Sequence, residues 1–238
     1  MWCRLNSRVS NSNINALLTR TGAIGATPDS GEIAFAGKEF FYNDAANGAN
    51  LDLLRQLHLD IWPEIRDIVK FDVPVVDHCY LLFKSPGGRA TRMHQDRPYW
   101  IKKEPQATII SVWIALDAIT ADNGGLSLVR QNEVDVSDMS SFNSGTVLGH
   151  EEVELSDGSF PLLIREDVAK KVAETMVPVD MGKGDVIAFD SFEPHMANAN
   201  TTDAPRLGMK IAYADKGIKK HYLVRVDELE SGTTSATQ

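Results

Sequence analysis

Residues 93–100 read MHQDRPYW, and this stretch governs the interpretation of the rest of the chain. In an extended strand, residues two positions apart point to the same side, so His94 and Asp96 can face one cavity while Gln95 faces away. A second imidazole, His195, closes the stretch FEPH at 192–195. Two imidazoles and a carboxylate can occupy one face of a metal octahedron and leave three positions open, as in non-haem Fe(II) oxygenases. The sequence therefore predicts His94, Asp96 and His195 as metal ligands and catalytic residues, against the alternative of a chance HQD in a loop.

Arg206 begins the strand-like stretch RLGMKIAY over residues 206–213. Alternation places Arg206, Gly208 and Lys210 on one face, while the opposite face is wholly apolar and suits a core. We therefore expect Arg206 to point into a lumen, where Gly208 leaves room for a ligand. A guanidinium binds carboxylates through two parallel hydrogen bonds, which predicts a bound carboxylate as its partner. A surface salt bridge is the alternative.

The remaining pattern indicates many short strands and few helices. Apolar residues recur every three or four positions between Leu51 and Val69, which predicts a helix, and Pro63 predicts a break near Ile61–Trp62. Strands are expected over residues 73–83, 107–116, 126–129, 177–179, 185–189 and 206–213, with a helical patch over 165–174. Short strands separated by polar turns are typical of a β-sandwich or barrel.

The order of these motifs resembles the phytanoyl-CoA dioxygenase family of Fe(II)- and 2-oxoglutarate-dependent oxygenases. The matching stretches are MHQDRPYW at 93–100, VWIALD at 112–117, DNGGL at 122–126, GKGDV at 182–186, Asp190, His195 and Arg206. The resemblance implies a mainly β fold with bracing helices, the double-stranded β-helix or cupin-like jelly roll. It also implies Fe(II), dioxygen and the cosubstrate 2-oxoglutarate, whose distal carboxylate Arg206 would hold.

Further candidate residues for binding 2-oxoglutarate are Trp113, Ser111 and Lys84. Trp113 and Ser111 share one face of a predicted strand, and the resemblance implies a pocket-lining tryptophan near this point. Lys84 matches a recurrent basic position of the family. Core packing is the alternative for Trp113.

Basic residues concentrate around the metal motif, namely Lys84, Arg89, Arg92, Arg97, Lys102 and Lys103. In an acidic chain this cluster predicts a mouth that attracts a small anionic metabolite, with Arg97, Tyr99 and Trp100 as candidate substrate residues. A solvated loop is the alternative. Where the family continues from DNGGL into a Pro-Gly-Ser-His turn, residues 129–133 read VRQNE, so the resemblance does not extend to the substrate.

The resemblance implies hydroxylation with release of succinate and carbon dioxide, because Asp96 stands where halogenating relatives leave room for chloride. Oxidative ring closure or desaturation would use the same ligands. A non-catalytic, cupin-like protein that binds a metal or a small molecule is the second functional class.

Composition excludes several classes of protein. The 238 residues suit one domain, with a lead-in segment expected over 1–30, the oxygenase domain over 31–228 and a disordered tail over 229–238. The 24 Lys+Arg and 33 Asp+Glu give a net charge of −9, which argues against nucleic-acid binding. The apolar runs are too short to span a membrane. Cys3 and Cys79 are isolated, so no disulfide is expected.

These features favour a cytoplasmic protein, with organelle targeting as the alternative because the first 28 residues carry Arg and Ser but no acidic residue. The oligomeric state is left open. Among the other histidines, His58, His150 and His221 are expected to be structural or solvated, and His78 is expected in the core.

Overall fold

The computed structural model describes residues 1–21, 33–35, 49–101, 108–142, 144–153, 162–215 and 222–232. Its strands are β1 (Trp2–Arg4), β2 (Ile33–Phe35), β3 (Pro74–Lys84), β4 (Thr91–His94), β5 (Ile109–Ala115), β6 (Leu126–Val129), β7 (His150–Glu152), β8 (Leu162–Ile164), β9 (Met176–Pro178), β10 (Val186–Asp190), β11 (His195–Ala197), β12 (Arg206–Asp215) and β13 (Val224–Arg225). Its helices are α1 (Asn11–Thr21), α3 (Ala49–Ile68), α4 (Pro98–Ile101), α5 (Glu166–Ala173) and α6 (Val226–Ser231), with short 3-10 helices at Arg130–Asn132 and Val136–Ser141.

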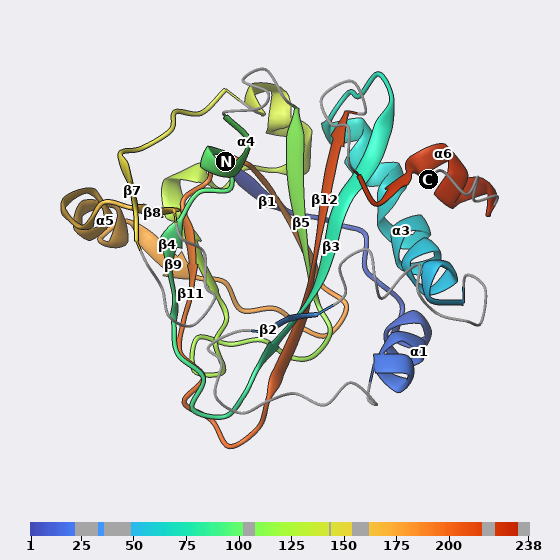
Figure 1. Cartoon of the computed structure of the whole chain (residues 1–238), viewed down its shortest axis with the longest axis horizontal. Coiled ribbons are helices and arrows are strands. Elements are labelled where there is room, and N and C mark those ends of the chain that lie inside the picture. The colour runs from blue at the N-terminus through green and yellow to red at the C-terminus, as the bar shows by residue number, and fades with distance from the viewer. Residues whose placement is uncertain are drawn as a thin grey trace.

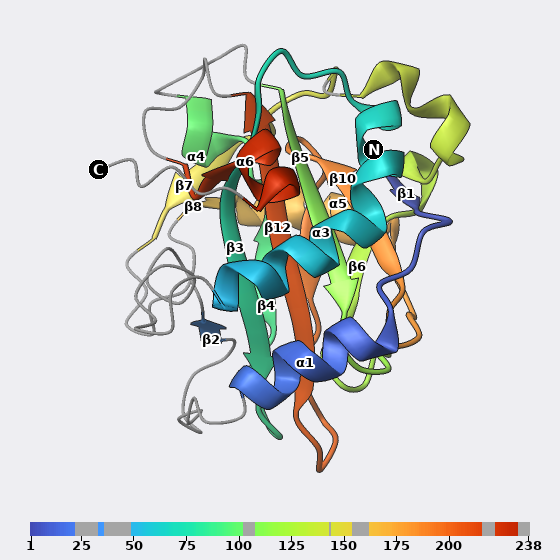
Figure 2. The same ribbon diagram turned by 90° about the vertical axis from the view of Figure 1, so that its right-hand side faces the viewer.

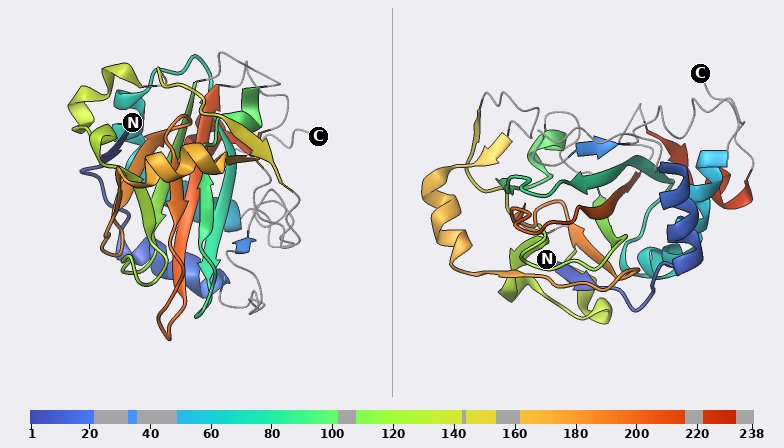
Figure 3. Two further views of the ribbon diagram at one scale, coloured as in Figure 1. Left: turned by 90° about the vertical axis from the view of Figure 1, so that its left-hand side faces the viewer. Right: turned by 90° about the horizontal axis from the view of Figure 1, so that it is seen from below.

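Two antiparallel sheets face each other and enclose the interior of a barrel (Figure 1). Within the described residues, the larger sheet has seven strands in the order β1-β10-β5-β12-β3-β13, with β2 also paired to β3. The smaller sheet has four strands in the order β4-β11-β6-β9, and β7 and β8 form a separate pair. Figure 3 shows α5 and the β7–β8 pair on the side of the barrel away from α1, α3 and α6. The observed architecture is mainly β with bracing helices, as the sequence predicts.

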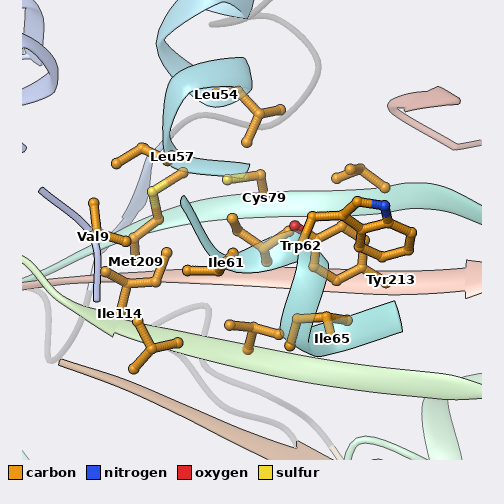
Figure 4. Close-up of a cluster of buried hydrophobic side chains, with 14 of the residues drawn as sticks. Val9, Leu54, Leu57, Ile61, Trp62, Ile65, Cys79, Ile114, Met209 and Tyr213 are labelled. Carbon is orange, nitrogen blue, oxygen red and sulfur yellow. The ribbon is translucent and has the colours of Figure 1, made fainter. Parts of the chain in front are cut away.

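Helices α1, α3 and α6 cover the outer face of the larger sheet (Figure 2). The apolar stripe of α3 packs on alternate residues of the strands beneath it, and this forms the main core (Figure 4). The predicted helix therefore exists, but α3 continues through Pro63 instead of breaking before it. Proline cannot bond to the carbonyl four residues earlier. That carbonyl belongs to Leu59, which is 38% exposed and so lies on the solvent side of the helix.

The segment predicted as a lead-in forms part of the packed structure. β1 pairs with β10 at the edge of the larger sheet, and Trp2 and Cys3 are buried. α1 packs in the same core as α3 through Ile14 and Leu17. Residues 22–30 of that segment lie outside the described residues.

Part of the segment predicted as a disordered tail forms a helix. Residues 229–231 belong to α6, and Leu229 is buried against the main core. Residues 233–238, His221, Lys102 and Lys103 lie outside the described residues. None of the described helices is long and apolar enough to cross a membrane. Cys3 and Cys79 are both free thiols within the core.

Candidate metal and cosubstrate site

His94 and His195 lie opposite each other in the smaller sheet. His94 ends β4, and its Cα partner is His195 at the start of β11. Their ring centroids are 4.2 Å apart. We expected an extended strand through Asp96, but the strand ends at His94, and Asp96 reaches the site from the following bend. Its Oδ1 nevertheless lies 3.8 Å from His195 Nε2. The structure thus brings all three predicted ligands together.

Backbone carbonyls orient both imidazoles in the same way. His94 Nδ1 donates to the carbonyl of Arg92 at 2.9 Å, and His195 Nδ1 donates to the carbonyl of Glu193 at 3.0 Å. Each bond requires the proton on Nδ1, so Nε2 carries the lone pair that a metal needs. Burial, followed by the neighbouring His195, lowers the pKa of His94 to about 3, which keeps its imidazole neutral.

The two oxygens of Asp96 have different partners. Oδ2 accepts hydrogen bonds from Ser111 Oγ and Lys210 Nζ, each at 2.6 Å, while Oδ1 faces His195. Burial by itself would raise the pKa of the Asp96 carboxyl, but Lys210 and the two histidines outweigh it and hold this pKa well below its usual range. The carboxylate is therefore ionised and directs one oxygen toward the imidazoles.

This donor set fits a divalent transition metal. One ligand atom from each of His94, Asp96 and His195 lies within 4.8 Å of the other two, and all three residues are buried. Ligands on one face of an octahedral ion with bonds of about 2.1 Å lie roughly 3 Å apart, so small side-chain movements are sufficient. Two neutral imidazoles and one carboxylate are the donors that non-haem Fe(II) uses.

A cavity adjoins the two histidines inside the barrel. Its walls are largely apolar and include Leu82, Trp113, Leu126, Phe189 and Met196. Tyr80, Thr91 and Lys210 supply the polar groups. An apolar wall with few polar groups positions a small ligand and excludes water around the ligand atoms.

Arg206 and Lys84 lie side by side at one end of the barrel. They are Cα partners on β12 and β3, and both are fully buried. Arg206 donates to the Gly124 carbonyl at 2.8 Å, and Lys84 donates to the Asn198 carbonyl at 2.7 Å. The sequence argument required a bound carboxylate to satisfy the buried guanidinium. Backbone carbonyls accept hydrogen bonds from both cations but carry no negative charge, so a bound carboxylate stays the predicted partner of Arg206.

Trp113 fills the space that the sequence assigned to a ligand beside Gly208. A Cβ on Gly208 would lie 2.5 Å from the Trp113 ring, so the glycine makes room for the indole. The Arg206 guanidinium carbon lies 5.4 Å from an indole ring centroid, in a cation–π contact. Trp113 lines the cavity, whereas Arg206 and Lys84 are not among its described lining residues. Trp113 is therefore the contact between the cavity and this basic end of the barrel.

The candidate substrate residues have other contacts than expected. Arg97 is buried, with its guanidinium 4.8 Å from the ring centroid of Phe192. The Tyr99 hydroxyl lies 3.1 Å from the amide nitrogen of Leu162 on β8 and accepts its hydrogen bond. Neither residue lines the cavity, because the chain turns into α4 directly after Asp96. The predicted basic cluster is also divided, since Lys84 is buried inside the barrel while Arg89 and Arg92 are exposed.

Trp100 lies near a pair of residues that the sequence did not indicate, Asp77 and His78. The register of β3 against β12 shifts after the pair His78–Ala212, so Asp77 is the extra residue of a β-bulge. A bulge redirects side chains, and here it lets Asp77 Oδ2 accept a hydrogen bond from His78 Nδ1 at 2.6 Å. The His78 ring lies 4.7 Å from that of Tyr80 and 6.3 Å from that of Trp100, between centroids.

His78 therefore belongs to the mouth of the site and not simply to the core. It neighbours Tyr80, which lines the cavity, and Lys210 and Asp96 both influence its pKa. Burial is the largest influence and lowers the pKa of His78, which favours a neutral ring with its lone pair on Nε2. Alternation could not predict this position, because a bulge breaks the period of two.

Gln95 links the two halves of the metal motif. Its side-chain amide donates to the carbonyls of Thr146 and Phe192, and its carbonyl accepts a hydrogen bond from the Leu148 amide. Phe192 begins the FEPH stretch that ends at His195. The residue between the two ligands thus holds the segment that carries the third.

Known proteins resemble this chain in both sequence and fold. The chain is 31% identical over 133 residues to a 2-aminoethylphosphonate dioxygenase from the uncultured bacterium HF130_AEPn_1, covering 55% of this chain and 42% of the relative. It is 28% identical over 149 residues to a phytanoyl-CoA dioxygenase domain-containing protein 1 from Danio rerio, covering 60% of this chain and 47% of the relative. The matched regions thus span less than half the length of these two relatives.

Solved structures share the architecture at lower sequence identity. EvdO2 from Micromonospora carbonacea var. aurantiaca, in complex with 2-oxoglutarate, superposes with a TM-score of 0.61 at 20% identity and covers 90% of this chain and 85% of its own. The apoform of EctD from S. alaskensis has a TM-score of 0.56 at 18% identity and covers 92% of this chain and 74% of its own. These neighbours support the double-stranded β-helix expected from the sequence. The model of the phytanoyl-CoA dioxygenase family matches residues 3–208, and the chain therefore belongs to the phytanoyl-CoA dioxygenase family.

Proposed function

We propose that the protein is an Fe(II)- and 2-oxoglutarate-dependent dioxygenase that hydroxylates a small metabolite. The observation that carries this proposal is the convergence of His94, Asp96 and His195 beside a cavity inside the barrel. Bound Fe(II) and 2-oxoglutarate would supply the oxidising chemistry, in which dioxygen delivers one oxygen atom to a substrate C–H bond and the other to succinate as carbon dioxide leaves. The protein holds, orients and shields these reactants.

The roles of the residues follow from their placement. His94, His195 and Asp96 would hold the metal on one face and leave the cavity side open. Trp113 and Phe189 form an apolar wall that limits water. Arg206 stays our candidate for binding the distal carboxylate of 2-oxoglutarate, because it matches the family motif and lies behind Trp113. Lys84 beside it is a second cation for the same carboxylate.

For the substrate, we propose a small anionic metabolite that also carries a hydrogen-bond donor. A neutral His78, oriented by Asp77, presents an acceptor near Tyr80 and Trp100, which suits an ammonium or hydroxyl group. The exposed Arg92 follows Thr91 of the cavity wall and would attract the anionic group. 2-Aminoethylphosphonate, named for one relative, has both features and is the first compound to test.

The decisive experiment measures succinate release with Fe(II), ascorbate and 2-oxoglutarate against a panel of small amino- and hydroxy-substituted anions. We expect slow release without substrate and faster release with the correct compound, both abolished by a chelator. Analysis of the product would separate hydroxylation from ring closure or desaturation. If metal-loaded protein releases no succinate under any condition, the non-catalytic binding protein is the better interpretation.

A further inference from the structure

Lys210 is a buried cation in the wall of the cavity. It lies on the inward face of β12, with Tyr80 of β3 and Trp113 of β5 as its Cα partners. The residue is 8% exposed, and it lines the cavity together with His94 and His195. A lysine is almost never this buried unless a partner compensates its charge. Its partner is the metal-ligand candidate Asp96, whose Oδ2 lies 2.6 Å from the ammonium nitrogen.

We propose that Lys210 is a positioning residue whose charge couples metal binding to binding of the anionic cosubstrate. This inference rests on the proposed function and deepens it. It assigns to Lys210 one effect on the geometry of Asp96 and one effect of charge, which disfavours the entering cation and favours the entering anion.

The first effect concerns the geometry of Asp96. Lys210 and Ser111 both donate to Oδ2, while Oδ1 lies 3.8 Å from His195 Nε2. With Oδ2 held by two donors, Asp96 offers the metal a single oxygen. One oxygen and two imidazole nitrogens occupy three positions, which leaves three for the cosubstrate and dioxygen.

The second effect concerns charge. A metal binds histidines in their neutral form, and the charges of Asp96 and Lys210 cancel, so the ligand set that receives the metal has no net charge. A divalent metal ion then makes the site doubly positive, and the doubly negative 2-oxoglutarate neutralises it. Without Lys210 the empty ligand set would carry a negative charge, which would favour binding of the metal ion. The metal-loaded site would then be less positive, which would disfavour binding of the 2-oxoglutarate dianion. Such charges act strongly in a site that excludes water.

The test measures binding of Co(II) to the metal-free protein, followed by binding of 2-oxoglutarate to the Co(II)-loaded protein, by calorimetry. Lys210→Met removes the charge and keeps the length of the side chain. We expect its Kd for 2-oxoglutarate to rise by about tenfold or more, because the metal-loaded site loses one of the positive charges that attract the dianion. Its Kd for Co(II) should be unchanged or lower. If Lys210 had only a structural role, its replacement would weaken the binding of both ligands together.

Three further variants control for folding and for charge. Lys210→Gln keeps a donor for Asp96 but removes the charge, so it should reproduce the loss of 2-oxoglutarate affinity even if Lys210→Met fails to fold. Lys210→Arg keeps the charge and should restore much of the affinity. Lys170→Met removes an exposed charge from α5, where the side chain is 74% exposed, and should change neither Kd.

Two results would overturn this inference while leaving the proposed function intact. One is a Kd for 2-oxoglutarate within about twofold of wild type in both Lys210→Met and Lys210→Gln. The other is a parallel loss of affinity for Co(II) and for 2-oxoglutarate. A wild-type protein that binds Co(II) but no 2-oxoglutarate would instead refute the proposed function, and the inference with it.

Discussion

Both faces of strand β12 in the larger sheet are buried, but they differ in chemistry. On β12, the outward residues Met209, Ile211 and Tyr213 pack under α3 in the main core. The inward residues of the same strand include Arg206, which donates to a backbone carbonyl, and Lys210, which pairs with Asp96 inside the barrel. Burial of apolar surface stabilises a fold, whereas a buried charge costs stability unless its partners are complete. The comparison indicates that residues alternate in role along β12. Outward residues contribute to stability, and inward residues contribute to the site.

The largest effect should come from removing a metal ligand on the inner side of the barrel. His94→Ala should lower 2-oxoglutarate-dependent succinate release by well over a hundredfold, since changes to residues that merely support a ligand already cost about 10–100-fold. Its melting temperature should stay close to wild type, because little core packing is lost. His150→Ala, on β7 outside the cavity, is the matched control and should keep its activity. Near-normal release by His94→Ala would contradict the metal assignment.

The converse effect should come from the outer face. Leu57 is completely buried between α3 and the sheet, so Leu57→Ala should lower the free energy of unfolding by about 2–5 kcal/mol. Activity per folded molecule should stay the same. Leu59→Ala on the same helix removes a side chain that is 38% exposed and should change stability by less than about 0.5 kcal/mol. Urea titrations give the stability, and a large loss of activity in folded Leu57→Ala would break the proposed separation of the two faces.

A smaller effect is expected at the basic end of the barrel. Arg206→Lys keeps the charge but loses the planar guanidinium, so the KM for 2-oxoglutarate should rise roughly ten- to a hundredfold. Steady-state kinetics with varied 2-oxoglutarate would measure this rise. An unchanged KM would move the anchor to Lys210, which lines the cavity, or to Lys84.

The smallest effect concerns acid stability at the outer face. Burial, followed by the neighbouring Arg55 charge, lowers the pKa of His58 to about 3, and its Nδ1 lies 3.0 Å from the Tyr213 hydroxyl. The unfolded chain, in which His58 has a pKa of about 6.5, binds more protons than the folded protein between these two values. The stability due to this difference is therefore complete above about pH 6.5 and declines as the pH falls toward 3.

Wild type should consequently lose about 1–2 kcal/mol more stability than His58→Gln between pH 7 and pH 5. Unfolding titrations of both proteins at the two pH values would measure the difference. The two proteins should show nearly equal changes between pH 7 and pH 8, where the imidazole is mostly neutral in both states. Equal losses at pH 5 would mean that His58 does not contribute to acid sensitivity.

Much of the fold could be predicted from local patterns. The α3 stripe and the strands β3, β5, β10 and β12 follow apolar periodicity, and alternation along β12 correctly separated its core face from its lumen face. The place of β1 at the sheet edge was not predicted, because a strand of three residues has no readable period. The end of the strand at His94 and the turn into α4 were also not predicted, since an extended strand was expected through Asp96.

The sequence by itself determined the chemical types of the metal-ligand candidates, the order of these residues along the chain and the family. These are properties of residue identity and spacing, and they do not depend on how the chain packs. Only the tertiary structure decided which buried groups meet, including the bond between Lys210 and Asp96, the bulge that joins Asp77 to His78, and the filling of the space beside Gly208 by Trp113. These contacts join separate strands, and register, bulges and close packing across a sheet depend on the whole folded chain.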